Sequence, residues 1–190
     1  MELLHEILNC IPTVVTSVYR EKMLKALVLL MYYGCLRVGE VSFSSSYKHI
    51  LKLSHITLNG RGLTIRFESY KHSTTESEGI KYVIKATTSE FCPVAAMNSY
   101  LLIRKKCVGG YLFTEEDGKT VTRDSIATVI KRAVSLTGRN SELFNTHSLR
   151  IGRATDLAKL GYSDTKIKQI GRWKSRAFAD YIRPSEILLA

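Results

Sequence analysis

The chain has 190 residues, of which 28 are lysine or arginine and 17 are aspartate or glutamate, giving a net charge of +11. This length suits one domain with short extensions, and a hydrophobic fraction of 45% excludes a largely disordered chain. A strongly basic domain attracts polyanions, either nucleic acid or an acidic membrane surface. The longest apolar run, 26–36, is too short to span a bilayer, so we expect no transmembrane helix.

The N-terminus and the cysteines indicate the compartment. The first six residues include two glutamates where a secretion signal would be basic, so we expect no export peptide. The four cysteines stand far apart without a Cys-x-x-Cys pair, which argues against a disulfide framework and against a zinc knuckle. An intracellular, reducing compartment fits best, and this would be the nucleus in a eukaryote.

The first half of the chain predicts a helix followed by a small sheet. Residues 23–33 are apolar on nearly all sides, which is typical of a buried helix. The pattern then changes to short alternating runs at 50–58 and 63–67, joined by the hairpin signal Asn59-Gly60. A third run at 80–86 completes a predicted three-stranded antiparallel sheet.

The second half predicts helices. Pro93 suits the first turn of a helix that runs to about residue 107. The side chains of Thr122, Thr146 and Ser163 suit N-caps, which begin helices at 123–136, at 147–160 and, for a shorter one, at Asp164. Residues 174–182 have a helical pattern as well. We therefore expect an α+β fold, a mostly helical single domain over 1–190 with one small three-stranded antiparallel sheet and a C-terminal tail at 183–190.

The positive charge belongs to the last third of the chain. Residues 121–190 hold 13 basic and 6 acidic side chains, a net charge of +7, whereas 1–60 and 61–120 each have +2. A solvated helical face is the plain explanation of such an excess. The charge excess alone therefore does not indicate a function, and the other residues in this part of the chain have to be considered.

Four local clusters stand out, and each has an ordinary structural explanation when taken singly. Arg37 and Glu40 are three residues apart and could pair on a helix surface. Lys71 lies in a polar stretch between two strands, where a solvated lysine is the default. His147 and Arg150 share the first turn of a helix, where unpaired N–H groups also favour a phosphate. Finally, Trp173 is the sole tryptophan, usually a core residue, and Tyr181 follows it.

In this order the clusters resemble the tyrosine recombinases, also called the phage-integrase family. The catalytic set of that family is an Arg, a Lys on a β-hairpin, a His-x-x-Arg pair, a His or Trp, and a nucleophilic Tyr. The matching residues here are Arg37, Lys71, His147, Arg150, Trp173 and Tyr181. The spacings of 23 residues from Arg150 to Trp173 and of 8 from Trp173 to Tyr181 also resemble the family's pattern. The segments around Trp173 and Tyr181 are more similar to recombinases of eukaryotic mobile elements (Crypton-, DIRS- or Ngaro-like) than to bacterial integrases.

Phosphoryl transfer explains why these residue types occur together. Negative charge builds on the nonbridging oxygens of an attacked phosphodiester, and preorganised cations must meet it. The planar guanidinium groups of Arg37 and Arg150 match phosphate geometry, and His147 and the Trp173 indole N–H are further donors. Tyr181 would be the nucleophile that forms a covalent 3′-phosphotyrosine.

The remaining roles concern protons, orientation and DNA contact. His147 is the best placed acceptor for the phenol proton, and the resemblance implies that Lys71 protonates the leaving 5′ oxygen. Glu40 is expected to orient the active-site cations. DNA contacts are expected from the basic residues around the tryptophan, namely Arg172, Lys174 and Arg176.

Other chemistries fit the sequence less well. Tyr100, Tyr111 and Tyr162 also follow the predicted hairpin, but only Tyr181 lies in a helix-like segment downstream of Trp173. The carboxylates show no paired ligand spacing, so no metal is expected, and no Gly-x-x-x-x-Gly-Lys loop is present to bind ATP. We therefore expect no cofactor.

The leading hypothesis is a site-specific DNA recombinase that integrates or excises DNA. Its partner would be double-stranded DNA, with a homotetramer on paired sites and a monomer or weak oligomer without DNA. A type IB topoisomerase and a domesticated, non-catalytic DNA-binding module are the alternatives, and a membrane role is the weakest. The family usually carries an N-terminal core-binding domain, for which the 36 residues before Arg37 are too few. The C-terminal tail would dock on a neighbouring subunit or fold back on its own.

Overall fold

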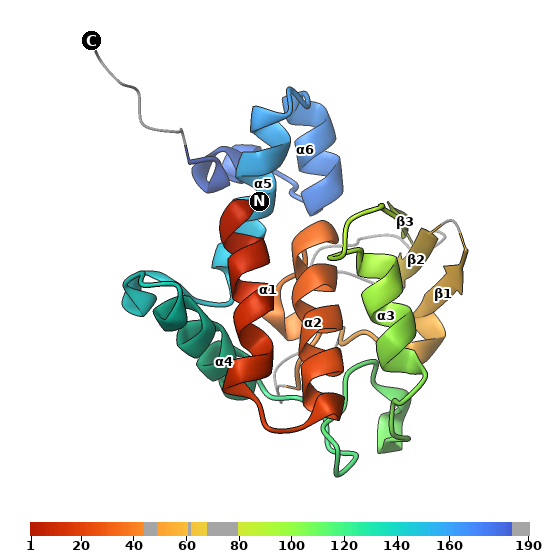
Figure 1. Ribbon diagram of the computed structural model, residues 1–190. Coiled ribbons are helices and arrows are strands. Elements are labelled where there is room, and N and C mark those ends of the chain that lie inside the picture. Colours follow the sequence, from red (N-terminus) through yellow and green to blue (C-terminus); the bar gives the residue numbers. More distant parts are fainter. Residues whose placement is uncertain (44–48, 61, 68–79, 184–190) are drawn as a thin grey trace.

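The fold is a row of helices with a small sheet at one edge and a helical cap at one end (Figure 1). A computed structural model describes residues 1–43, 49–60, 62–67 and 80–183, without the side chains of residues 176 and 177. The α-helices and strands are α1 (Glu2–Val14), α2 (Val18–Tyr33), β1 (Ile56–Asn59), β2 (Gly62–Phe67), β3 (Ile80–Lys85), α3 (Pro93–Leu101), α4 (Arg123–Leu136), α5 (Ser148–Lys159) and α6 (Asp164–Gly171). The described residues also form five short 3-10 helices: η1 (Val38–Glu40), η2 (Leu53–His55), η3 (Val108–Gly110), η4 (Ser141–Leu143) and η5 (Arg176–Tyr181).

The centre of the domain is helix α2, which is buried on almost every side. The hydroxyl of Ser17 caps its start by accepting from the Arg20 N–H at 3.1 Å. Helices α1 and α3 pack against α2, and α4 packs against α1. Helix α1, which the sequence pattern did not single out, buries one stripe of Leu4, Ile7, Leu8 and Ile11.

The sheet has the order β1-β2-β3 with antiparallel pairing throughout. Its inner face consists of Leu63, Ile65 and Phe67 on β2 with Ile84 on β3, all of them buried. The first strand is shorter than expected, because residues 50–55 are not part of the ladder. The Leu51 N–H donates to the Glu40 carbonyl at 2.8 Å, and the Leu51 carbonyl accepts from Leu112. These bonds lie outside the three-stranded sheet, and Lys52 forms an isolated antiparallel bridge with Tyr111.

Helix α3 is also shorter than expected and ends at Leu101. Beyond it, the Arg104 side chain donates to the Leu112 carbonyl at 2.8 Å, and the Lys105 N–H donates to the Tyr19 hydroxyl at 3.2 Å. These bonds hold the chain in an irregular path across the bottom of the helix row. The helical pattern of residues 102–107 is therefore overridden by tertiary contacts.

Helices α5 and α6 and the 3-10 helix η5 form the cap at one end of the row (Figure 1). Ser163 caps α6 as expected, whereas the N-cap of α5 is His147 and Thr146 is buried. The last helical segment is the 3-10 helix η5, which starts two residues later than expected. A separate small core that includes Leu157, Ile167 and Phe178 holds the cap together.

The expected fold class is confirmed: a mostly helical domain with one three-stranded antiparallel sheet. Within the described residues, no helix is both long and apolar enough to cross a membrane.

Candidate active site

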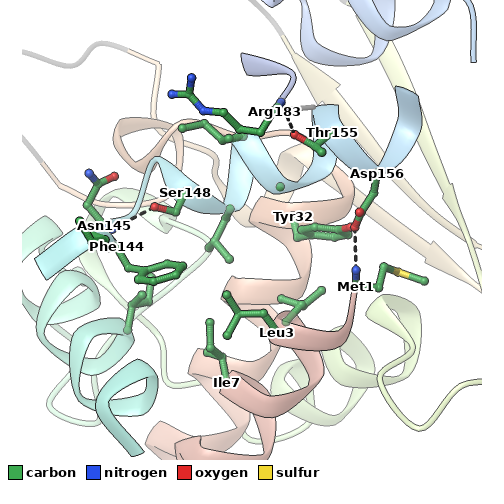
Figure 2. A pocket seen from close by; sticks show the side chains of 16 residues that line it. Met1, Leu3, Ile7, Tyr32, Phe144, Asn145, Ser148, Thr155, Asp156 and Arg183 are labelled. Atoms are coloured by element: carbon green, nitrogen blue, oxygen red, sulfur yellow. Dashed lines mark hydrogen bonds and ion pairs between the residues drawn. The ribbon is translucent and has the colours of Figure 1, made fainter. Parts of the chain in front are cut away.

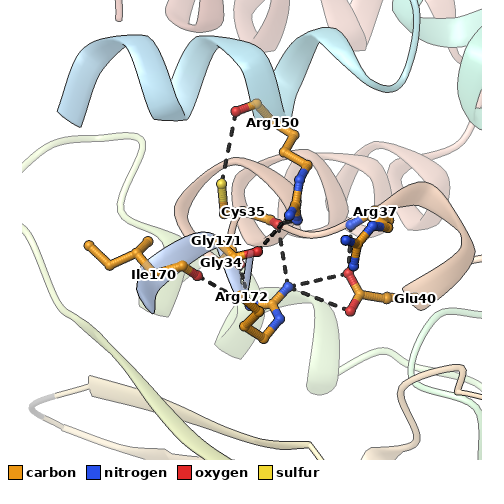
Figure 3. A network of polar contacts seen from close by, with 8 residues as sticks. All are labelled: Gly34, Cys35, Arg37, Glu40, Arg150, Ile170, Gly171 and Arg172. Carbon is orange, nitrogen blue, oxygen red and sulfur yellow. Dashed lines mark hydrogen bonds and ion pairs between the residues drawn. The ribbon is translucent and has the colours of Figure 1, made fainter. Parts of the chain in front are cut away.

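Arg150 lies at the centre of the site and is fully buried. It projects from the first turn of α5 towards the loop after α2 and the end of α6 (Figure 3). One terminal nitrogen donates to the Cys35 carbonyl, and the other donates to the Gly171 carbonyl. Burial lowers the pKa of Arg150 to about 10, so the guanidinium keeps its charge at neutral pH.

Two aromatic rings cover this guanidinium. The Trp173 ring centroid lies 4.2 Å from the Arg150 Cζ atom, and the Tyr181 ring centroid lies 5.7 Å from it. The centroids of the two rings are 5.1 Å apart, and the rings are nearly edge to face. Among the described residues, no acceptor pairs with the Arg150 Nε or the Trp173 Nε1, although both atoms are buried. The site thus contains two buried N–H donors that a ligand could satisfy.

His147 completes the cluster from the N-terminal end of α5. Its ring centroid lies 4.9 Å from that of Tyr181. Burial lowers the pKa of His147, and the charges of Arg150 and Arg37 lower it further. The imidazole is therefore neutral at pH 7, which is the form that can accept a proton.

Arg37 lies at the N-cap of η1 and is half-buried. Its charge lowers the pKa of both His147 and Arg150, so the three side chains lie within electrostatic reach of one another. The structure thus brings together five of the six expected catalytic residues: Arg37, His147, Arg150, Trp173 and Tyr181. The sixth, Lys71, lies outside the described residues.

Glu40, which the sequence suggested as an orienting group for the active-site cations, is buried and pairs with Arg172, which is not one of the expected catalytic residues. One carboxylate oxygen accepts from the Arg37 backbone N–H at 2.6 Å. The same oxygen forms an ion pair with Arg172 at 3.3 Å. The sequence had suggested Arg172 as a DNA contact; in the structure its side chain is only 3% exposed and is paired with Glu40.

The other two expected DNA contacts have different positions. Lys174 is exposed on the bend after Trp173, where a ligand can reach it. The side chain of Arg176 lies outside the described residues.

The alternative tyrosines do not share this environment. Tyr100 is fully buried, and its hydroxyl donates to the Leu112 carbonyl at 3.2 Å. Tyr111 packs against Phe43, and Tyr162 is exposed on the turn between α5 and α6. Tyr181 alone among these four has ring contacts with both His147 and Arg150 in the described structure.

Thr155, which the sequence did not suggest, fixes the segment that carries Tyr181. Its hydroxyl donates to the Tyr181 carbonyl at 3.2 Å and accepts from the Arg183 N–H at 3.0 Å. Thr155 lies on α5, the helix that also carries Arg150, so one rigid element orients the arginine and the tyrosine. No local pattern in the sequence marks Thr155, because its partners Tyr181 and Arg183 lie 26 and 28 residues further along the chain.

A separate apolar hollow of about 400 Å³ lies between α1, α4 and α5 (Figure 2). Its walls include Leu4, Ile7 and Leu149, and its rim carries Tyr32, whose hydroxyl donates to Asp156. It holds none of the six expected catalytic residues. In the part of the chain that the structure describes, His, Cys, Asp and Glu side chains form no group of three or more that could hold a metal ion.

The family model for the phage integrase family matches residues 4–183, which span this whole arrangement. The chain belongs to the phage integrase family. Its members are the tyrosine recombinases, so the resemblance of the sequence motifs is confirmed at the level of the family. No curated protein matches the chain.

Solved structures share the fold of this phage integrase family member. The XerH recombinase bound to its difH substrate has a TM-score of 0.71 at 17% identity, and covers 97% of this chain and 50% of its own. The XerA recombinase has a TM-score of 0.69 at 20% identity, and the match covers 97% of this chain and 59% of the XerA chain. A lambda integrase dimer bound to a COC′ core site has a TM-score of 0.61 at 14% identity, and the match covers 98% of this chain and 49% of the integrase chain. The chain thus spans about half the length of the structures it matches.

Proposed function

We propose that this protein is a site-specific DNA recombinase that cuts and rejoins DNA strands through a covalent 3′-phosphotyrosine on Tyr181. The observation that carries the proposal is the contact of the Tyr181 ring with both His147 and Arg150. A potential nucleophile, a neutral base and a fixed cation meet there, which is the combination that phosphoryl transfer needs.

The phosphate would bind between the two arginines. Arg37 and Arg150 neutralise the charge that builds on the nonbridging oxygens. The Arg150 Nε and the Trp173 Nε1 supply the unpartnered donors. Because Arg150 is fully buried under the rings of Trp173 and Tyr181, an arriving phosphate has to move these rings aside. DNA binding and assembly of the reactive geometry are therefore coupled.

The chemical step then transfers one phosphoryl group. The Tyr181 oxygen bonds to phosphorus as the bond from phosphorus to the 5′ oxygen breaks. His147 accepts the phenol proton, and Lys71 gives a proton to the leaving 5′ oxygen. Attack by a 5′ hydroxyl from another strand reverses these steps and releases Tyr181. The phosphodiester energy is conserved in the phosphotyrosine, so the exchange needs no external energy source.

Capture of the covalent adduct tests the proposal and selects the DNA target in the same experiment. The protein is incubated with a pool of nicked duplexes of random sequence, in which cleavage releases a short strand and prevents religation. We expect an adduct that survives denaturation, with one enriched DNA sequence.

The matched control exchanges another tyrosine. Tyr181→Phe should abolish the adduct, whereas Tyr162→Phe, at the exposed turn, should retain it. An adduct that persists in Tyr181→Phe would refute the assignment of the nucleophile. Binding of DNA without any adduct would favour a non-catalytic module, and relaxation of supercoiled plasmid without strand exchange would favour a topoisomerase.

A further inference from the structure

Apart from the Ile170 carbonyl, the acceptors around the Arg172 guanidinium come from one short segment, residues 34–40 (Figure 3). One terminal nitrogen donates to the Gly34 carbonyl at 3.0 Å. The other donates to the Cys35 carbonyl at 3.3 Å and pairs with the Glu40 carboxylate at 3.3 Å. The Phe67 ring covers the guanidinium, with 4.3 Å between its centroid and the Arg172 Cζ atom. A planar group with several donors fits this pocket, whereas a lysine ammonium does not.

These acceptors lie on both sides of Arg37 in the chain. Gly34 and Cys35 precede it, and Glu40 follows it and also binds the Arg37 backbone N–H. Arg172 therefore fixes the two ends of the loop that presents Arg37.

The same network reaches Arg150. The Cys35 carbonyl that accepts from Arg172 also accepts from Arg150, and the other terminal nitrogen of Arg150 binds the carbonyl of Gly171, the residue before Arg172. Both arginine side chains thus donate hydrogen bonds to the same two backbone segments, one after α2 and the other at the end of α6.

The backbone at both anchor points is in the left-handed region. Cys35 has a φ of +50° and Arg172 a φ of +55°, and they are the two non-glycine residues with positive φ in the described part of the chain. Such conformations persist where the surrounding contacts determine them strongly. One of these two residues supplies the carbonyl that binds both arginines, and the other is one of those arginines. We infer that this backbone arrangement serves the site as well as the fold.

We propose that Arg172 is a positioning residue, which sets the distance between Arg37 and Arg150 so that both meet one phosphate. This inference rests on the proposed function and deepens it. Arg172 acts through Glu40 and the Cys35 carbonyl, and it does not itself touch DNA. It is distinct from the DNA contact that its sequence position suggested.

The test compares Arg172→Lys and Arg172→Gln with a matched control. The lysine variant keeps a charge opposite Glu40 and so protects against a failure to fold. The control is Arg139→Gln, which removes another arginine–glutamate pair, with Glu6 on α1. Each variant is assayed on the DNA captured by the wild type, for its affinity, its salt dependence and its single-turnover rate of adduct formation.

We expect Arg172→Lys to lower the adduct rate by about 10²-fold, the effect of a displacement of about 1 Å in a catalytic group. Its DNA affinity and salt slope should stay at the wild-type values, and Arg139→Gln should keep the wild-type rate. Adduct formation by a folded Arg172→Lys within about threefold of the wild type would overturn the proposal. A salt slope reduced by about 1 would also overturn it, because that result marks a direct phosphate contact.

A second measurement needs no DNA. In the wild type, the fixed acceptors should hold the Arg150 guanidinium still, so that its terminal nitrogens give separate NMR signals. In Arg172→Gln these signals should average, whereas Arg139→Gln should leave them separate. Unchanged Arg150 signals in Arg172→Gln would overturn the proposal. If the wild type forms no adduct, the proposed function fails, and this measurement alone decides the role of Arg172.

Discussion

Thr155→Val removes the hydroxyl that attaches the Tyr181 segment to α5 and keeps the shape of the side chain. The Tyr181 carbonyl loses a donor at 3.2 Å, and the Arg183 N–H loses an acceptor at 3.0 Å. At about 1 kcal/mol for each net hydrogen bond, the docked segment loses about 2 kcal/mol relative to a detached one. This corresponds to about a 30-fold change in the docking equilibrium.

Two assays measure this change. Amide hydrogen exchange at Arg183 should accelerate, because its N–H opens to water more often. The single-turnover rate of adduct formation should fall by up to about 30-fold, while DNA affinity stays near the wild-type value. Thr155→Ser, which retains the hydroxyl, is the control and should behave like the wild type.

The result that would refute the reasoning is specific. If Thr155→Val accelerated exchange at Arg183 and kept the wild-type rate, docking of the segment would not limit the chemistry. If the serine variant lost as much activity as the valine variant, packing of the methyl group would matter more than the hydroxyl.

Three further predictions concern the site and the core. Gly171→Ala would place a Cβ atom 1.5 Å from the Trp173 ring, so the ring must move and the adduct rate should fall by about 10²-fold; a wild-type rate would contradict this packing. Because the His147 pKa is lowered, the acid limb of a pH–rate profile should lie below pH 6.5 and vanish in His147→Gln, and a wild-type midpoint at or above 6.5 would argue against His147 as the base. Ile11→Ala should lower the free energy of unfolding in urea by about 2–5 kcal/mol, because Ile11 is fully buried in α1; a loss below about 1 kcal/mol would mean that the site repacks.

Local signals predicted several elements correctly. Pro93 begins α3, and the Thr122 and Ser163 side chains cap α4 and α6. These signals can be recognised in the sequence because each depends on contacts within one helical turn. The alternating run that starts at residue 50 predicted a strand that begins too early. The reason is that the Leu51 backbone bonds to Glu40 and Leu112, which are not its neighbours in the sequence.

The candidate site divides in the same way. Arg37, His147, Arg150, Trp173 and Tyr181 were identified from residue types, order and spacing, and the structure brings them together. The sequence could not reveal the burial of Arg172, because a basic residue between glycine and tryptophan has the same local pattern whether it faces water or the interior. Its acceptors lie more than 130 residues earlier in the sequence, and only tertiary structure reveals them.

The position of Trp173 also provides a built-in optical probe. The chain contains one tryptophan, and its indole stacks on Arg150 and touches Tyr181. Any anion that displaces the ring from the guanidinium changes the surroundings of the sole indole fluorophore. The intrinsic emission of the unlabelled protein should therefore report on occupancy of the site, and under the proposed function a stopped-flow trace would separate DNA docking from the later cleavage step.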